Sequence, residues 1–156
     1  MDELFDIIEL YKFEYPLWSD NSLKEIFQHI YPSIVLGQYK IHSDEEGVYG
    51  FRNWAFLDEE AEQNYMIKRE IDFDDWNSGD RVWVIDTIFK RKHNEAMTFY
   101  KTFFAHLLGV GKPVQWFRLA PNGLIRSCLL YTSDAADDTP CVDLAGRRII
   151  KKKRGG

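Results

Sequence analysis

The stretch DDWNSGDRVWVIDTI, residues 74–88, decides the fold class of this 156-residue chain. Its second half, residues 81–88, is rich in β-branched and aromatic side chains, which is typical of a strand buried on both faces. Asp86 interrupts that apolar run. Its carboxylate is either a structural partner of Arg81, Arg52 or a backbone N–H, or a functional group that faces a cleft.

The sequence on both sides of this strand predicts one mixed α/β domain. Apolar side chains recur at helical spacing in three segments, residues 2–12, 22–32 and 95–108. A fourth helix is predicted over residues 58–70, which begin with acids and end with bases, as suits the helix dipole. Ser22 and Glu25 form a capping-box pattern at the start of the second helix, and Pro32 is expected to stand near its end or to kink it. Extended runs around the turn SDEEG predict a β-hairpin within residues 37–57, and residues 114–119 predict one further strand.

The unit of strand, helix and strand over residues 81–119 indicates a parallel pair with a right-handed crossover. Open α/β sheets bind ligands at the carboxyl ends of such strands. Asp86 stands near the carboxyl end of the first strand, so we expect a ligand to approach it.

The last part of the chain, residues 128–156, follows neither a helical nor a strand pattern. Back-translated from Cys128 onward, it resembles the transposon end, linker, barcode and primer of a sequencing library, in that order and in one reading frame. A genuine basic tail is the alternative. We therefore expect residues 1–127 to form a domain truncated at its C-terminus, and residues 128–156 to be a non-native, disordered tail.

Composition restricts the function classes. The chain is 45% hydrophobic with a net charge of −5. The tail holds both cysteines, 6 of the 20 Lys and Arg, and 4 of the 25 Asp and Glu, so residues 1–127 carry a net charge of −7. Hence we expect no disulfide, no metal site and no nucleic-acid partner. No apolar run approaches the roughly 20 residues of a membrane span, and the acidic start is unlike a signal peptide, which predicts a cytoplasmic protein.

Four stretches resemble the lysine acyltransferases that activate RTX protoxins. They are PLW (16–18), YPSIVLGQYKI (31–41), NWAFL (53–57) and, above all, DDWNSGDRVWVID (74–86). The resemblance covers most of residues 5–120 and runs without gaps from Pro16 to Tyr39. It implies a GNAT-like fold, a mixed sheet flanked by helices.

The resemblance also implies an activity, the transfer of a fatty acyl group from acyl carrier protein to internal lysines of a protoxin, with no bound cofactor. In that family a histidine near the N-terminus and an aspartate on the central strand form the catalytic pair. Asp86 stands at the aspartate position, but Trp18 stands at the histidine position. An indole N–H accepts no proton, so Trp18 cannot act as a base.

A base is needed because a lysine amine, with a pKa of about 10.4, is almost fully protonated at neutral pH. Asp86 could serve if burial raises the pKa of its carboxyl. His29 and His42 are the candidate substitutes, each with the alternative of a partly exposed residue without function. The basic loop of Lys90, Arg91 and Lys92 would suit an acidic acyl carrier protein, or is simply solvated.

Three functions follow. The first is the protein-lysine acyltransferase, and the second is a catalytically impaired relative that only binds an acyl carrier or toxin-like partner. The third is a CoA-dependent GNAT enzyme acting on a small amine, ranked lowest because TIFKRKHNEA (87–96) has no glycine to cradle a pyrophosphate. The target lysine, the acyl length and the oligomeric state, including a homodimer, are not fixed by the sequence.

Overall fold

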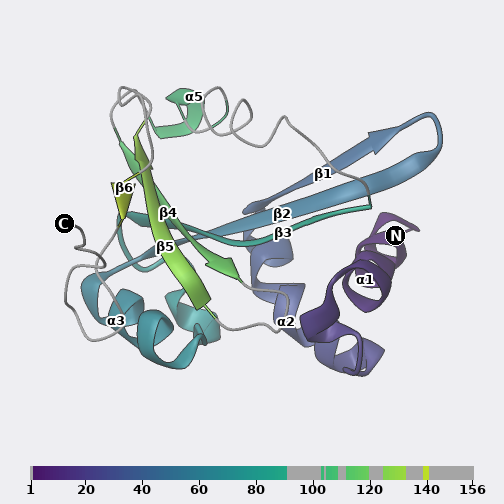
Figure 1. Ribbon diagram of the computed structural model, residues 1–156, viewed down its shortest axis with the longest axis horizontal. Helices are drawn as coiled ribbons and strands as arrows, with labels where there is room; N and C mark the ends of the chain where they lie inside the picture. The colour runs from purple at the N-terminus through teal and green to yellow at the C-terminus, as the bar shows by residue number, and fades with distance from the viewer. Residues whose placement is uncertain are drawn as a thin grey trace.

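A computed structural model describes residues 2–90, 103, 105–108, 112–119, 125–132 and 139–140 (Figure 1). In these ranges the chain forms a six-stranded sheet of order β1-β2-β3-β4-β5-β6. Helices α1, α2 and α3 lie on one face of the sheet, and the short α5 lies on the other (Figure 1). None of the helices in the described ranges is long and apolar enough to cross a membrane.

Two N-terminal helices cover one half of the sheet. Helix α1 spans Asp2–Glu14 and α2 spans Leu23–Leu36. The expected capping box is confirmed, because Ser22 Oγ accepts from the Glu25 N–H and Glu25 Oε1 accepts from the Ser22 N–H. Pro32 lies near the end of α2, as predicted, but does not itself end the helix. It is buried inside α2, which continues to Leu36 and stops at Gly37 in the left-handed conformation (φ 71°).

The predicted hairpin is confirmed as β1 (Tyr39–Asp44) and β2 (Gly47–Leu57). Strand β3, Arg81–Phe89, pairs antiparallel with β2, and β4, Pro113–Leu119, pairs parallel with β3. The parallel pairing includes only two positions, Val82 with Val114 and Trp83 with Gln115. Strand β3 therefore continues past its last partner on β4, and Asp86 lies in that continuation.

Helix α3 (Glu59–Lys68) and the 3-10 turn η2 (Phe73–Asp75) connect β2 to β3. Asp58 caps α3 by accepting from the Ala61 N–H at 2.8 Å. The glycine of the NSGD segment is required by a close approach, because a Cβ on Gly79 would stand 2.6 Å from the Leu57 carbonyl oxygen.

The C-terminal part differs from the sequence expectation at one point. Strand β5 (Ile125–Thr132) pairs antiparallel with β4 and continues beyond residue 127, and β6 (Thr139–Pro140) pairs with β5. An open strand edge can form hydrogen bonds with any extended backbone, whatever its side chains. Such pairing therefore leaves no signal in the pattern of apolar and polar residues. The non-native origin of residues 128–156 stays a prediction. Helix α5 (Ala105–Leu108) is the described end of the predicted helix 95–108.

Candidate active site

Asp86 owes its orientation to an irregularity in the β2–β3 ladder. Asn53 pairs with Asp86 and the next residue of β2, Trp54, pairs with Val84, so Ile85 is an extra residue on β3. A bulge of this kind bends the strand and redirects side chains. As a result the consecutive residues Ile85 and Asp86 both line the same pocket.

The Asp86 carboxylate receives two side-chain hydrogen bonds at one oxygen. Tyr11 Oη and His29 Nε2 each lie 2.6 Å from Asp86 Oδ2. Behind the carboxylate, the Asp86 backbone N–H donates to Asn53 Oδ1 at 2.9 Å. The carboxylate is therefore held from α1 and α2 and the Asp86 backbone from β2, with only 5% of the residue exposed.

The proposed arginine partners of Asp86 are engaged elsewhere. Arg81 forms ion pairs with Glu62 and Glu59 at 3.5 and 3.9 Å. Arg52 donates from Nε to His42 Nε2 at 3.1 Å. The structural alternative of an arginine-matched Asp86 is therefore wrong.

The expected direction of the Asp86 pKa shift is also wrong. Burial raises the pKa of this carboxyl, but the charge interaction and the hydrogen bond with His29, together with the hydrogen bond from Tyr11, outweigh it, so the net pKa is lowered. Asp86 is consequently an ionised acceptor and a poor proton acceptor in its own right. Tyr11 stays a donor, because burial and then the charge of Asp86 raise the pKa of its phenol.

His29 stands on α2 with 24% of its side chain exposed. Because an ionised carboxylate only accepts hydrogen bonds, His29 Nε2 must carry the hydrogen that it shares with Asp86. Its second ring nitrogen, Nδ1, has no hydrogen-bond partner among the described residues. A neutral His29 would thus keep its lone pair on Nδ1, as an imidazole held by an aspartate does.

Trp18 packs against the imidazole instead of replacing it. It closes the 3-10 turn η1 (Pro16–Trp18), and its ring centroid lies 4.3 Å from that of His29 at an interplanar angle of 32°. The indole also meets the Tyr11 ring edge-on, at 6.2 Å and 81°. Trp18 therefore packs against the His29 ring and helps fix its orientation.

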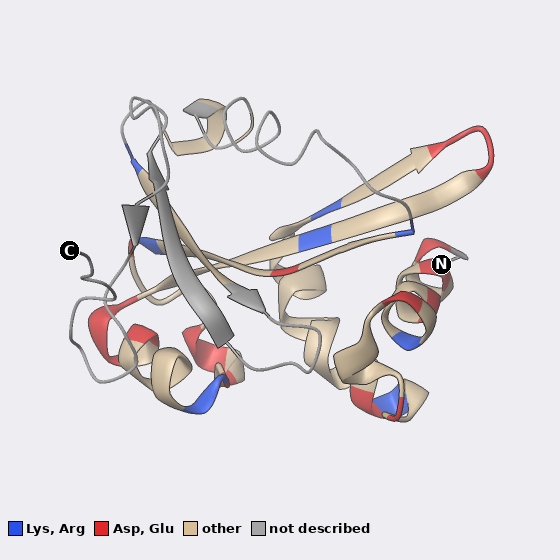
Figure 2. Cartoon of the chain, in the orientation of Figure 1, with Lys and Arg blue, Asp and Glu red and all other residues tan. Residues whose placement is uncertain are grey.

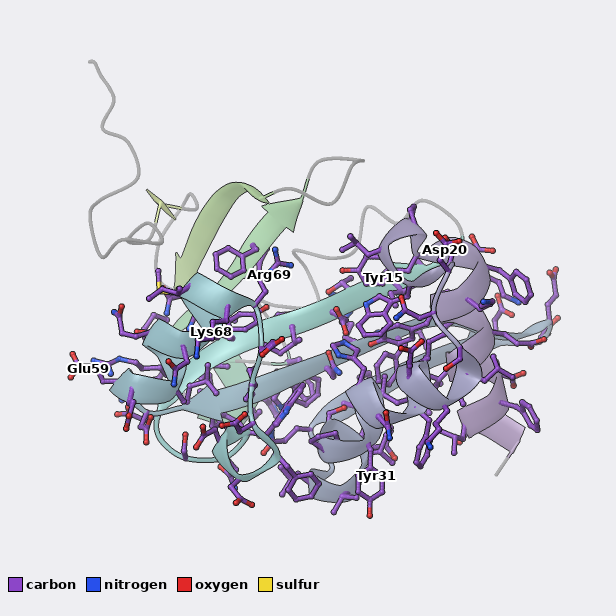
Figure 3. All side chains as sticks on the ribbon, turned by 90° about the horizontal axis from the view of Figure 1, so that it is seen from below. Tyr15, Asp20, Tyr31, Glu59, Lys68 and Arg69 are labelled. Atoms are coloured by element: carbon purple, nitrogen blue, oxygen red, sulfur yellow. The ribbon has the colours of Figure 1, made fainter. Side chains whose placement is uncertain are left out.

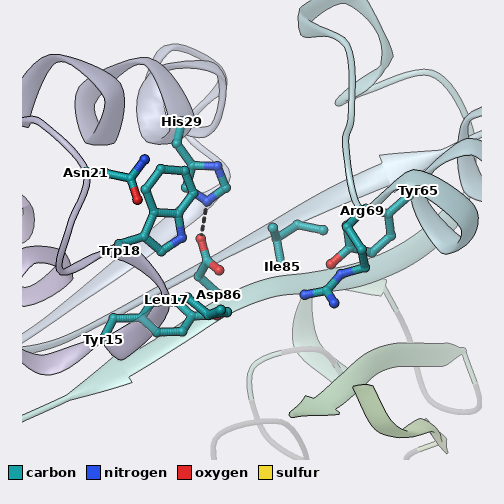
Figure 4. A pocket seen from close by; sticks show the side chains of 9 residues that line it. All are labelled: Tyr15, Leu17, Trp18, Asn21, His29, Tyr65, Arg69, Ile85 and Asp86. Carbon is teal, nitrogen blue, oxygen red and sulfur yellow. Dashed lines mark hydrogen bonds and ion pairs between the residues drawn. The ribbon is translucent and has the colours of Figure 1, made fainter. Parts of the chain in front are cut away.

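Two adjoining pockets open beside these residues. One of about 210 Å³ includes Asp86, Tyr15 and Asn21, and one of about 380 Å³ includes Gln28, Lys68 and Trp76. Both are bounded by a common set of residues, Trp18, His29, Tyr65, Arg69 and Ile85. Figure 4 shows the smaller pocket, with His29 and Asp86 on one side of Ile85 and Arg69 on the other.

The remaining predicted site residues lie away from the pockets. His42 is on β1, bonded to Arg52, and lines neither pocket. Lys90 follows β3 as an exposed residue whose backbone N–H donates to the Tyr49 carbonyl at 2.9 Å. Arg91 and Lys92 lie outside the described residues. Figure 2 shows acidic positions at the hairpin tip, on α1 and on α3, with basic positions scattered among them.

Three site residues carried no signal of function in the sequence. Tyr11 belongs to the apolar stripe of α1, Asn53 lies inside a strand, and Arg69 is one of several charges at the end of α3. Within the described ranges, no group of three or more His, Cys, Asp or Glu could hold a metal ion.

Comparison with known proteins places these residues in a family context. The model of the RTX toxin acyltransferase family matches residues 4–105. The leukotoxin-activating lysine-acyltransferase of Aggregatibacter actinomycetemcomitans is 38% identical over 80 residues, 51% of this chain and 48% of that protein. The RTX-II toxin-activating lysine-acyltransferase of Actinobacillus pleuropneumoniae is 32% identical over 74 residues, 47% of this chain and 46% of that protein.

A protein-lysine palmitoyltransferase of Bordetella bronchiseptica is 31% identical over 85 residues, 53% of this chain and 46% of that protein. This chain thus spans about half the length of the curated relatives it matches. Among solved structures, the loading GNATL domain of CurA from Lyngbya majuscula aligns with a TM-score of 0.56 at 18% identity, over 78% of this chain and 62% of that one. This likeness concerns the fold alone and confirms the GNAT-like architecture.

Proposed function

We propose, from the finding that this chain belongs to the RTX toxin acyltransferase family, that it transfers a fatty acyl group to lysine side chains of a protein. The observation that carries the proposal is the hydrogen bond between His29 and Asp86 at the wall of a pocket. It supplies a histidine–aspartate pair even though the family's histidine position holds Trp18.

In the proposed reaction His29 is the general base and Asp86 is its orienting partner. As the neutral form of the incoming lysine amine attacks a thioester carbonyl with its lone pair, His29 Nδ1 takes the one proton that the nitrogen loses on becoming an amide. Asp86 fixes the tautomer with hydrogen on Nε2 and stabilises the imidazolium that forms. Its lowered pKa suits this role, because the carboxylate must stay ionised while the imidazole changes charge.

The donor in this proposal is an acyl carrier protein and the acceptor is an RTX-type protoxin, in the cytoplasm, with no bound cofactor. The names of the relatives support the acceptor, since they are described as toxin-activating. The basic segment Lys90, Arg91 and Lys92 is the proposed contact for the acidic carrier; Lys90 is exposed at the end of β3, as such a contact requires.

The test is a transfer assay with the full chain, acyl carrier protein loaded with C14 or C16 chains, and protoxin fragments from the systems of the curated relatives. The expected result is a mass gain of one acyl group per modified lysine, absent with His29→Asn. A parallel arm replaces the carrier with acetyl-CoA and a small amine. Product in that arm alone would identify the CoA-dependent enzyme instead, and no gain with any donor would refute the acyltransferase.

Trp18 favours a second candidate, an impaired relative that binds an acyl carrier or toxin-like partner without turnover. That protein would bind the carrier with an affinity unchanged by Asp86→Asn and would transfer nothing. Restored transfer in Trp18→His would then indicate an enzyme that lost its base at this position.

A further inference from the structure

Arg69 faces the His29–Asp86 pair across the smaller pocket. Figure 4 shows its guanidinium on the far side of Ile85 from Asp86, and Figure 3 shows Lys68 and Arg69 at the end of α3, on the same face of the sheet as Tyr15. The two pockets share Arg69 as a common boundary. A substrate in either pocket therefore shares that pocket with both His29 and this cation.

The backbone of Arg69 is in a conformation that disfavours its side chain. Arg69 ends α3 in the left-handed region at φ 61°, and it is the only non-glycine residue with positive φ in the described ranges. The equivalent position after α2 is Gly37, at φ 71°. Glycine adopts this conformation without steric cost, so the helix end alone gives no reason for an arginine.

The guanidinium is held in place but not neutralised. Its Cζ lies 5.2 Å from the centroid of the Phe117 ring on β4, a cation–π contact. Its Nε is buried without a hydrogen-bond partner, and within the described ranges no carboxylate lies within 4 Å of it. The charge nevertheless reaches the pocket. Burial and then the charge of Asp86 raise the pKa of Tyr65, and Arg69 opposes that rise; Arg69 also adds to the lowering of the Asp86 pKa, after His29 and Tyr11.

We infer that Arg69 is a further catalytic residue, which binds the oxygen of the thioester carbonyl and stabilises the negative charge that develops there. The inference rests on the proposed function. An unneutralised guanidinium opposite a general base in a pocket of about 210 Å³ is suited to a reacting group that fits between them and becomes anionic only during reaction.

The step balances without another reactant. The lysine nitrogen forms a bond to the carbonyl carbon, the C=O π electrons move to oxygen beside Arg69, and His29 takes the amine proton. The C=O bond then re-forms, the C–S bond breaks, and the thiolate takes the proton from His29. The products are an amide and the free thiol of the donor.

The first test compares Arg69→Gly, Arg69→Lys and the control Lys40→Met, which removes an exposed cation from β1 outside both pockets. Arg69→Gly should lower kcat by about 10²–10³, typical of a lost oxyanion donor, with KM changed less than threefold. Arg69→Lys should lose less, and Lys40→Met should match the wild type. The thermal midpoint of Arg69→Gly should not fall, because glycine adopts the left-handed conformation without steric cost. If Arg69→Gly does not fold, Arg69→Asn takes its place in the comparison, because asparagine also tolerates this conformation.

The second test does not depend on turnover. Infrared difference spectra of ¹³C-labelled acyl-pantetheine bound to the full chain, with no amine present, should show the thioester carbonyl band shifted to lower frequency in the wild type but not in Arg69→Gly. The inference is overturned if Arg69→Gly is as active as the wild type. It is also overturned if the carbonyl band has the same frequency in the wild type and in Arg69→Gly. If the wild-type band is shifted but the chain transfers no acyl group, Arg69 contacts the carbonyl oxygen and the proposed function is refuted.

Discussion

His29 Nε2 and Asp86 Oδ2 are 2.6 Å apart although 57 positions separate the two residues in the chain. Helix α2 carries the first and β3 the second, so the pair exists only when α2 is packed on the sheet. The Tyr11 hydroxyl shares the same carboxylate oxygen from α1. Folding of the N-terminal helices and assembly of the site are therefore one event.

His29→Asn should abolish most of the transfer activity while leaving the fold intact. The amide cannot accept the amine proton, so kcat should fall by about 10²–10⁴, the usual contribution of a general base. Steady-state rates with acyl carrier protein measure this. The matched control is His42→Asn, on β1 outside both pockets, which should keep wild-type kcat. Equal losses in both variants would remove His29 from the mechanism.

Asp86→Asn should reduce kcat by up to about 10⁴, because a neutral amide neither selects the required tautomer nor stabilises the imidazolium. Binding of the acyl carrier should persist, since Asp86 is buried behind Tyr11 and His29. Rates and carrier affinity are measured on the same preparation. Full activity of Asp86→Asn would show that the pair is structural.

Tyr11→Phe should weaken both stability and catalysis, each modestly. The change deletes one of two hydrogen bonds to Asp86, and a bond to a charged group contributes roughly 1.5–3 kcal/mol to the free energy of unfolding. Denaturant unfolding measures this loss. The pKa of Asp86 should also move upward, because one of its lowering contributions is gone. Tyr49→Phe, on the hairpin, is the control for loss of a phenol hydroxyl.

Acid should destabilise the protein through Asp86. Its pKa is lower in the folded than in the unfolded chain, where an aspartate titrates near about 3.9, so its contribution is complete above that value. The contribution is lost as pH falls through the folded pKa, because the unfolded chain then binds the extra proton. Melting curves between pH 7 and 3 should show a shallower acid decline for Asp86→Asn. The exposed Asp20→Asn should decline in parallel with the wild type.

Local sequence patterns were enough to predict most helices and strands, but not the hydrogen-bonded pair of His29 and Asp86. The hairpin, the central strand and the Ser22 capping box are set by residues close in sequence, and all three were predictable. The parallel β3–β4 pairing was predicted from the order of strand, helix and strand along the chain. Asp86 was identifiable because a carboxylate conflicts with an apolar run.

His29 and the Asp86 pKa direction could not be derived in the same way. Both depend on how α2 packs on the sheet and on the bulge at Ile85, which has no signature in the residues around it. Tyr11 was indistinguishable from a core aromatic because its hydroxyl partner lies 75 positions away. Long-range polar pairs such as these are the part of a site that one sequence does not specify locally.

A histidine placed at position 18 gives the sharpest test of the proposal that His29 on α2 takes the role of the family's histidine. Trp18 packs on His29 and lines the same pocket as Asp86, so a histidine at position 18 would stand in the same pocket as the carboxylate. The double variant Trp18→His with His29→Asn should recover part of the kcat lost in His29→Asn alone, because the base returns at the family's own position. Trp18→Phe with His29→Asn is the control, which keeps an aromatic ring but no base and should stay inactive. If Trp18→His with His29→Asn is no more active than the Trp18→Phe control, a base at position 18 does not act with Asp86. If His29→Asn alone keeps full activity, the base lies elsewhere, and Asp86 is left without a catalytic partner.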